Sequence, residues 1–248
     1  MSGLGSIIWS GYKEMKTILF AAFAVLAASS QAAIITQWNF NSVTPDANTA
    51  TGSATPSIGA GTVALVGGTT STFASGDASG GSTDPAVGDD SAWNVSTWAA
   101  QGTENKLRGA QFNVSTVGQL NVKVSWDHRH SNTSSKFVQF QYSTNGTDFV
   151  DFGSAFEATA GDTWFNTRSV DLSSITAVND NANFAFRIVA AFDPASGQYV
   201  ASSPTGTYGT TGTWRFDMVT VDAEPVPEPA TIALLGLGLA AAARKRRK

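Results

Sequence analysis

Apolar residues alternate with polar ones along the second half of the chain, and this period of two constrains the fold most strongly. In segment 121–126 the apolar residues are Val122, Val124 and Trp126, and Val138, Phe140 and Tyr142 repeat the spacing in the next strand. Successive side chains of a strand point to opposite faces, so the pattern predicts strands with one buried face.

Turn residues and further alternating segments extend this interpretation. Asn145-Gly146 is the preferred centre of a tight hairpin turn. With about eight or nine strands and no convincing helix between its two ends, the body is predicted to be an all-β, antiparallel two-sheet β-sandwich of jelly-roll type. Trp126 and Phe186 are expected in its core. The other expected strands are 34–40, 62–66, 163–172, 183–191 and 213–222.

The end of the chain combines a proline-flanked glutamate, a short apolar run and a basic cluster. A helix over the fourteen residues 230–243 would be about 21 Å long, short against the roughly 30 Å hydrocarbon core of a membrane. We therefore expect a transient transmembrane helix held by cations that favour the cytoplasmic side. The parts are the motif Pro227, Glu228 and Pro229, the run 230–243, and the basic residues Arg244, Lys245, Arg246, Arg247 and Lys248.

This tail resembles a PEP-CTERM sorting signal, which an exosortase recognises and removes. The resemblance implies delivery to the cell surface or extracellular matrix of a Gram-negative bacterium that makes extracellular polysaccharide, after transient anchoring in the inner membrane. An ordinary C-terminal membrane anchor is the alternative. Both interpretations place the body of the protein outside the cytoplasm. Segments 137–149, 184–189 and 213–221 are similar to extracellular jelly-roll domains of PEP-CTERM proteins and to some carbohydrate-binding modules.

The start of the chain carries an export signal. Lys16 precedes an apolar stretch at 18–28, and the small residues Ser30 and Ala32 occupy the −3 and −1 positions of a signal-peptidase site. We predict cleavage after Ala32 and Met15 as the true start. The expected organisation is an N-terminal extension and signal peptide at 1–32, a β-sandwich domain at 33–223 and a sorting tail at 224–248.

Composition limits the partners and chemistry of the body. Seven of the 15 Lys and Arg residues and three of the 19 Asp and Glu residues lie in the terminal segments. The body therefore keeps eight basic and sixteen acidic residues, and its net charge is near −8. A nucleic-acid partner is not expected, because the clustered Lys and Arg that phosphates require are missing. The absence of cysteine excludes thiol catalysis and Cys-based metal sites.

Two groups of residues are candidates for holding a metal ion. On a strand, residues two apart share a face, so His128 and His130 could reach one ion with Asp127 nearby. Zinc requires three or four ligands, and a polar loop edge is the alternative. Segment 44–90, rich in Gly, Ser and Thr, is expected as a long loop and could bind structural Ca²⁺, or its carboxylates could simply be solvated. The candidate Ca²⁺ ligands of this segment are Asp77, Asp84, Asp89 and Asp90. No other cofactor is expected.

Aromatic residues outside the alternation are the candidates for glycan contacts. Flat rings in loops can stack on sugars, although they can also plug the open end of a sandwich. The candidates are Trp93, Trp98, Tyr199 and Tyr208.

Catalytic signatures are missing from the sequence. There is no Gly-x-Ser-x-Gly elbow, and the acidic residues form no local pair typical of glycosidases, so no catalytic residue is predicted. We expect a non-enzymatic, exported surface or extracellular-matrix protein associated with biofilm or exopolysaccharide. A carbohydrate-binding module acting through loop aromatics is the alternative, and a secreted hydrolase is the third.

Overall fold

The structure is a computed structural model that describes residues 31–86 and 88–227. Ser30, Glu228, Pro229, the predicted membrane helix and the basic cluster lie outside the described residues. Within them, no helix is both long enough and apolar enough to cross a membrane.

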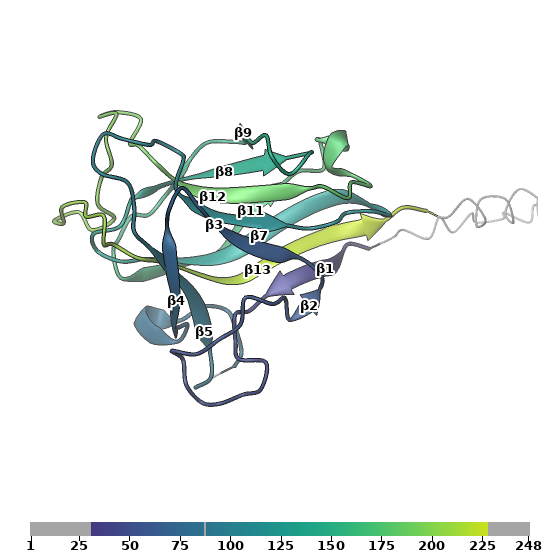
Figure 1. Cartoon of the computed structure of the whole chain (residues 1–248), viewed down its shortest axis with the longest axis horizontal. Helices are drawn as coiled ribbons and strands as arrows, with labels where there is room; N and C mark the ends of the chain where they lie inside the picture. The colour runs from purple at the N-terminus through teal and green to yellow at the C-terminus, as the bar shows by residue number, and fades with distance from the viewer. Residues whose placement is uncertain (1–30, 87, 228–248) are drawn as a thin grey trace, which may run out of the picture.

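The described residues form two antiparallel sheets that pack face to face (Figure 1). Sheet A has the order β11-β7-β13-β1-β2, with β5 also paired to β13 and β4 to β5. Its strands are β1 Ala33–Trp38, β2 Ile58–Gly59, β4 Thr70–Ser75, β5 Ser91–Ser96, β7 Gln119–His130, β11 Thr163–Asp171 and β13 Trp214–Pro225. Sheet B has the order β10-β8-β12-β6-β3, with β9 paired to β8. Its strands are β3 Thr62–Val66, β6 Gly109–Asn113, β8 Phe137–Ser143, β9 Val150–Asp151, β10 Phe156–Glu157 and β12 Ala185–Ala191.

The prediction of an all-β fold with two antiparallel sheets is confirmed. The strands outnumber the expected eight or nine because the alternation rule detects long, half-buried strands. It missed β2, β9 and β10, which have two residues each. It also missed β6 and the pair β4–β5, because their sequences carry many small or polar residues. The remaining regular elements in the described residues are two short 3-10 turns, η1 Ala78–Gly80 and η2 Thr176–Val178.

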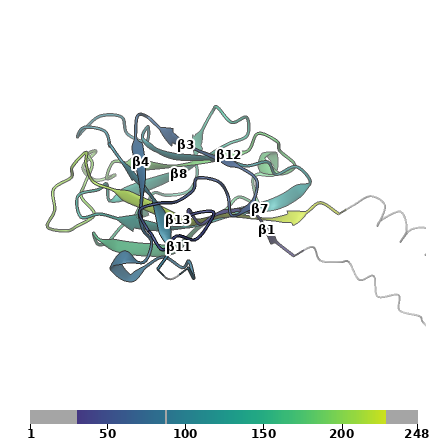
Figure 2. The same cartoon turned by 60° about the horizontal axis from the view of Figure 1, so that its bottom comes forward.

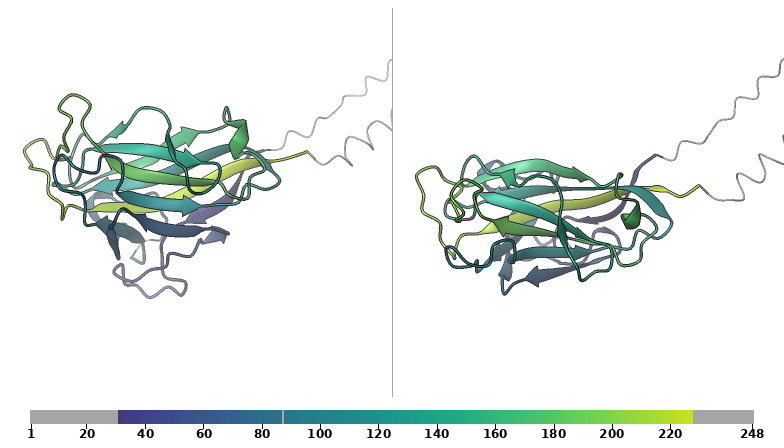
Figure 3. Two further views of the ribbon diagram at one scale, coloured as in Figure 1. Left: turned by 45° about the horizontal axis from the view of Figure 1, so that its top comes forward. Right: turned by 90° about the horizontal axis from the view of Figure 1, so that it is seen from above.

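Figure 3 shows the two layers of strands from two further directions. Aromatic side chains from both sheets fill the space between these layers. Phe112 of sheet B lies at the centre, with its ring centroid 4.9 Å from that of Phe186 and 6.3 Å from that of Phe216 of sheet A. Trp126 stacks on Phe140 across the layers at 5.9 Å. Trp126 and Phe186 are 1% and 0% exposed, so their prediction as core residues is confirmed.

The first and last strands are neighbours. Ala33 at the start of β1 pairs with Ala223 near the end of β13. Consequently β1 begins and β13 ends at the same end of the domain (Figure 2).

The long connection between β4 and β5, residues 76–90, lies against the outer face of sheet A at its described residues 76–86 and 88–90. The indole nitrogen of Trp164 on β11 donates to the carbonyl of Ala78 at 2.8 Å. The amide and hydroxyl of Thr83 both donate to a carboxylate oxygen of Asp127 on β7 at 2.6 Å. This segment, here called the 76–90 connection, is therefore bound to two strands of the sheet by side chains.

Candidate functional site

The aromatic candidates for glycan contact belong to the core and do not project from loops. Trp93 lies on β5 and is 4% exposed, and Trp98 and Tyr199 are each 2% exposed. Tyr208 is half-buried, stacks on Tyr199 at 4.7 Å and donates its hydroxyl to the carbonyl of Ala99. This corrects the sequence-based hypothesis. The polar sequence around Trp93 concealed a strand, and the rings of Trp98, Tyr199 and Tyr208 plug the sandwich end.

The two histidines also belong to the core. His128 and His130 are both 0% exposed, and their ring centroids are 4.2 Å apart. His128 stacks on Phe216 at 4.6 Å, and neither of its ring nitrogens has a hydrogen-bond partner. Asp127 points to the opposite face of β7, where Thr83 and the backbone amide of Thr167 satisfy its carboxylate. The structure therefore does not bring Asp127, His128 and His130 together as a metal site.

Acid should destabilise the protein through this histidine pair. Burial lowers the pKa of His128 and His130 well below 6.5, and each is further lowered by nearby positive charge. The folded state keeps both rings neutral, whereas the unfolded chain protonates them near pH 6.5, so their contribution is complete above that pH and lost below it. From pH 7 to 5.5 the two rings should together lower the free energy of unfolding by about 2 to 3 kcal/mol.

Denaturant midpoints measured across this pH range would test the histidine prediction. His128→Leu should remove about half of the pH-dependent loss, and comparison with the unmodified protein cancels contributions from other titrating groups. An unchanged pH slope in the variant would contradict the assignment to the buried histidines.

Three carboxylates from distant parts of the chain meet under the 76–90 connection. Asp84 and Asp90 belong to the connection and Asp217 to β13, and one oxygen from each lies within 4.8 Å of the others. Asp90 and Asp217 are 1% and 0% exposed, and Asp84 is half-buried. Among residues 31–86 and 88–227, this is the one such group of three or more His, Cys, Asp or Glu side chains. We call it the carboxylate cluster.

The carboxylate cluster has few hydrogen-bond donors. One oxygen of Asp90 accepts from the Ser82 hydroxyl at 3.2 Å, and one oxygen of Asp217 accepts from the backbone amide of Met218 at 2.7 Å. The second oxygen of each of these two residues is buried without a partner. Asp84 accepts from Asn41 and from the amide of Ala86.

Charge in the cluster is not balanced by neighbouring basic groups. Burial raises the pKa of Asp90 to about 6 and that of Asp217 well above its ordinary value, and repulsion between the two adds to the shift of Asp217. The five ion pairs of the described chain all involve other carboxylates. An uncompensated buried charge is costly, so protons or a bound cation must neutralise this cluster.

Sequence reasoning named Asp84 and Asp90 but missed Asp217. The sequence does hold a signal, because the apolar positions of the last strand are even at Trp214 and Phe216 but odd at Val219 and Val221. Such a change of parity marks a β-bulge. The structure has a register shift there, and Met218 adopts a positive φ of 45°. The bulge leaves Asp217 buried beside the two predicted aspartates.

The other two predicted Ca²⁺ ligands lie apart from the cluster. Asp77 is exposed and accepts from the amide of Gly88, and Asp89 accepts from the amides of Asp46 and Ala47. These are ordinary loop hydrogen bonds. The prediction that four aspartates of this segment share one site is therefore wrong for Asp77 and Asp89.

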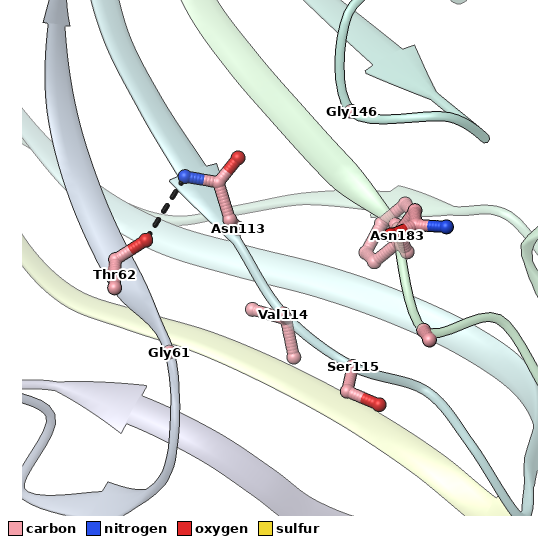
Figure 4. A pocket seen from close by; sticks show the side chains of 9 residues that line it. Gly61, Thr62, Asn113, Val114, Ser115, Gly146 and Asn183 are labelled. Atoms are coloured by element: carbon pink, nitrogen blue, oxygen red, sulfur yellow. Dashed lines mark hydrogen bonds between the residues drawn. The ribbon is translucent and has the colours of Figure 1, made fainter.

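Two surface hollows offer no convergent catalytic groups. One, of about 300 Å³, lies at an end of sheet B, where the amide of Asn113 donates to the Thr62 hydroxyl at 3.0 Å (Figure 4). No titratable residue lines it. The second, of about 460 Å³, is lined by Lys106, Asp151 and Asp193 among others. There Lys106 pairs with Asp151, so these charges largely satisfy each other.

The described residues define an all-β protein with a buried group of carboxylates beneath the 76–90 connection. The family model described as the PEP-CTERM protein-sorting motif matches residues 225–248. The chain thus carries this sorting motif, which confirms the resemblance of its tail. The motif is a signal processed by an exosortase, and it indicates an exported protein directed to the cell surface. No curated protein sequence matches the chain.

Several solved structures are similar to the chain at low identity. The CBM22-1–CBM22-2 tandem domain of Xyn10C from Paenibacillus barcinonensis has 8% identity and a TM-score of 0.43 over 81% of this chain and 49% of that one. The enzymatically active domain of tailspike protein 4 from bacteriophage CBA120 has 12% identity and a TM-score of 0.36, over 74% of this chain and 21% of that one. The K2 cleaved adhesin domain of Lys-gingipain has 12% identity and a TM-score of 0.33, over 77% of this chain and 97% of that one. The chain thus spans about half the length of the first, and none of these TM-scores is high enough to carry an argument about function.

Proposed function

We propose that this protein is a non-enzymatic component of the cell surface or extracellular matrix, with one jelly-roll domain that associates with biofilm or exopolysaccharide. The observation that carries the proposal is the sorting motif at 225–248 directly after a β-domain. The signal peptide exports the domain across the inner membrane of a Gram-negative cell, and the tail anchors it there transiently until an exosortase removes the tail.

The position of the termini supports this route. The first strand begins beside the last, since Ala33 pairs with Ala223. Signal-peptidase cleavage after Ala32 and processing at the tail would therefore act at the same end of the folded domain. The opposite end would stay free to meet other matrix components.

The buried polar chemistry supports a role without catalysis. The carboxylate cluster is enclosed, with Asp90 and Asp217 at most 1% exposed, so a polymer chain has no access to it. Hydrolysis of a polysaccharide needs two carboxyl groups flanking a bound glycosidic bond. We therefore expect no hydrolase activity.

Carbohydrate binding is the alternative function, and the 460 Å³ hollow is its best location. Concave sites with a few convergent polar groups are typical of small-ligand binding, and this hollow combines Asn105, Lys106 and Asp151 with the ring of Phe192. The loop aromatics named from the sequence cannot serve, because Trp93, Trp98 and Tyr199 are buried.

Co-sedimentation of the secreted protein with polysaccharide from the producing cells separates the two functions. If the domain is a matrix component without a glycan site of its own, Asn105→Ala should sediment to the same extent as the unmodified protein. Loss of sedimentation in this variant, with an unchanged unfolding midpoint, would favour the carbohydrate-binding alternative. Release of reducing sugar during the assay would contradict a non-enzymatic role.

A further inference from the structure

We propose that the carboxylate cluster of Asp84, Asp90 and Asp217 binds a Ca²⁺ ion that fastens the 76–90 connection to the last strand of the domain. This inference goes beyond the proposed function, since it concerns how the exported domain is stabilised. It holds whether or not the domain associates with polysaccharide.

The arrangement of the carboxylate oxygens in the cluster suits a cation. Three carboxylates offer ligand oxygens within 4.8 Å of one another, and two of them are almost completely buried. One oxygen of Asp90 and one of Asp217 have no hydrogen-bond partner, although both atoms are enclosed. When both carboxylates are ionised these two buried oxygens repel each other, and a divalent cation between them would convert that repulsion into attraction.

The donor atoms favour calcium over other biological cations. All three side chains present hard carboxylate oxygen, which suits Ca²⁺ and Mg²⁺, whereas zinc and copper prefer nitrogen and sulfur. The Ser82 hydroxyl, 3.2 Å from Asp90, is a further oxygen beside the cluster. Ca²⁺ accepts six to eight oxygens in flexible geometry, while Mg²⁺ demands a near-ideal octahedron. A site assembled from a loop and a β-bulge is better matched to Ca²⁺.

Local structure holds the ligands in place for an ion. The backbone amide of Gly76 donates to the carbonyl of Asp90 at 2.8 Å, and the amide of Ser82 donates to the carbonyl of Gly76 at 3.0 Å. A Cβ atom on Gly76 would lie only 2.0 Å from a carboxylate oxygen of Asp90. The absence of a side chain at Gly76 thus makes room for the Asp90 carboxylate. Beside it, the β-bulge at Asp217 turns the third carboxylate toward the connection.

A bound ion would link the 76–90 connection to a third strand of sheet A. The connection already contacts β7 through Thr83 and Asp127, and β11 through Ala78 and Trp164. Coordination by Asp217 would add a link to β13, the strand at the centre of sheet A. An exported domain without disulfides would gain from such a link in a medium where millimolar Ca²⁺ is common.

Thermal unfolding of the full chain in EDTA and in excess CaCl2 tests the proposal. For the unmodified protein, Ca²⁺ at about a hundred times its dissociation constant should raise the midpoint by about 5 to 10 °C. Asp217→Asn should abolish this rise. In EDTA the variant should melt at or above the unmodified protein, because an amide has no carboxylate charge to bury in the cluster. The matched control Asp148→Asn, which changes an exposed remote aspartate, should keep the full rise.

Binding of CaCl2 measured by titration calorimetry gives a second readout. Asp84→Asn alters the half-buried ligand and should weaken Ca²⁺ binding about tenfold or more. This variant keeps the proposal testable if Asp217→Asn does not fold. Mg²⁺ should produce a smaller shift of the midpoint than Ca²⁺. The proposal is overturned if Ca²⁺ leaves the unmodified midpoint unchanged, which would mean that protons neutralise the cluster. It is also overturned if the Asp84 and Asp217 variants respond to Ca²⁺ as fully as Asp148→Asn does.

Discussion

Truncation of Phe112 to alanine is expected to lower the free energy of unfolding by about 3 to 5 kcal/mol. The Phe112 ring is 0% exposed and contacts aromatic rings from both sheets, at 5.3 Å from Trp38, 4.9 Å from Phe186 and 6.3 Å from Phe216. Its removal opens a cavity that neighbours fixed in two sheets can fill only in part. Equilibrium denaturation monitored by tryptophan fluorescence would measure the loss.

Leu107→Ala is the matched control for the Phe112 truncation. Leu107 is 59% exposed and only a few residues from Phe112 in sequence, so its truncation should change the free energy of unfolding by about 0.5 kcal/mol at most. Equal losses in the two variants would contradict the placement of Phe112 at the centre of the core.

Replacement of Pro227, Glu228 and Pro229 by alanine should block release of the protein from the membrane. Proline disfavours a helix at and before its own position, so the sequence predicts an extended motif, and a protease needs an extended segment to recognise its substrate. The apolar run and basic cluster stay intact, so an unprocessed precursor should accumulate in the membrane fraction. Pulse-chase labelling with cell fractionation would follow it, and intact mass of the secreted protein would report the cut.

The basic cluster provides the matched control for the motif variant. Neutralising the five residues 244–248 removes positive charges that each favour the cytoplasmic surface by on the order of 1 kcal/mol. This variant should leak through the membrane uncut, which is a different defect from accumulation. If the alanine variant were released at the normal rate, the proline motif would not be the recognition element.

The prediction of the fold from the sequence rested mainly on the alternation of apolar and polar residues. Val122, Val124 and Trp126 are all buried as expected, because a strand in a two-sheet core must turn every second side chain inward. The same rule failed around Trp93. There the strand β5 is short, and only Trp93 and Val95 alternate with the polar residues Asn94 and Ser96, so among the small polar residues of this region the pattern was too brief to indicate a strand.

The sequence alone determined the sorting tail, because a linear signal is read by its enzymes as an extended or helical segment without a folded context. It also determined the class of fold, since a period of two follows directly from strand geometry. Only the tertiary structure decided where the polar residues act. It enclosed His128 between aromatic rings, and it brought Asp217 to Asp84 and Asp90 across more than a hundred residues of chain. Burial and long-range proximity depend on how strands pair and layers pack, and neither is encoded in the spacing of residues along the chain.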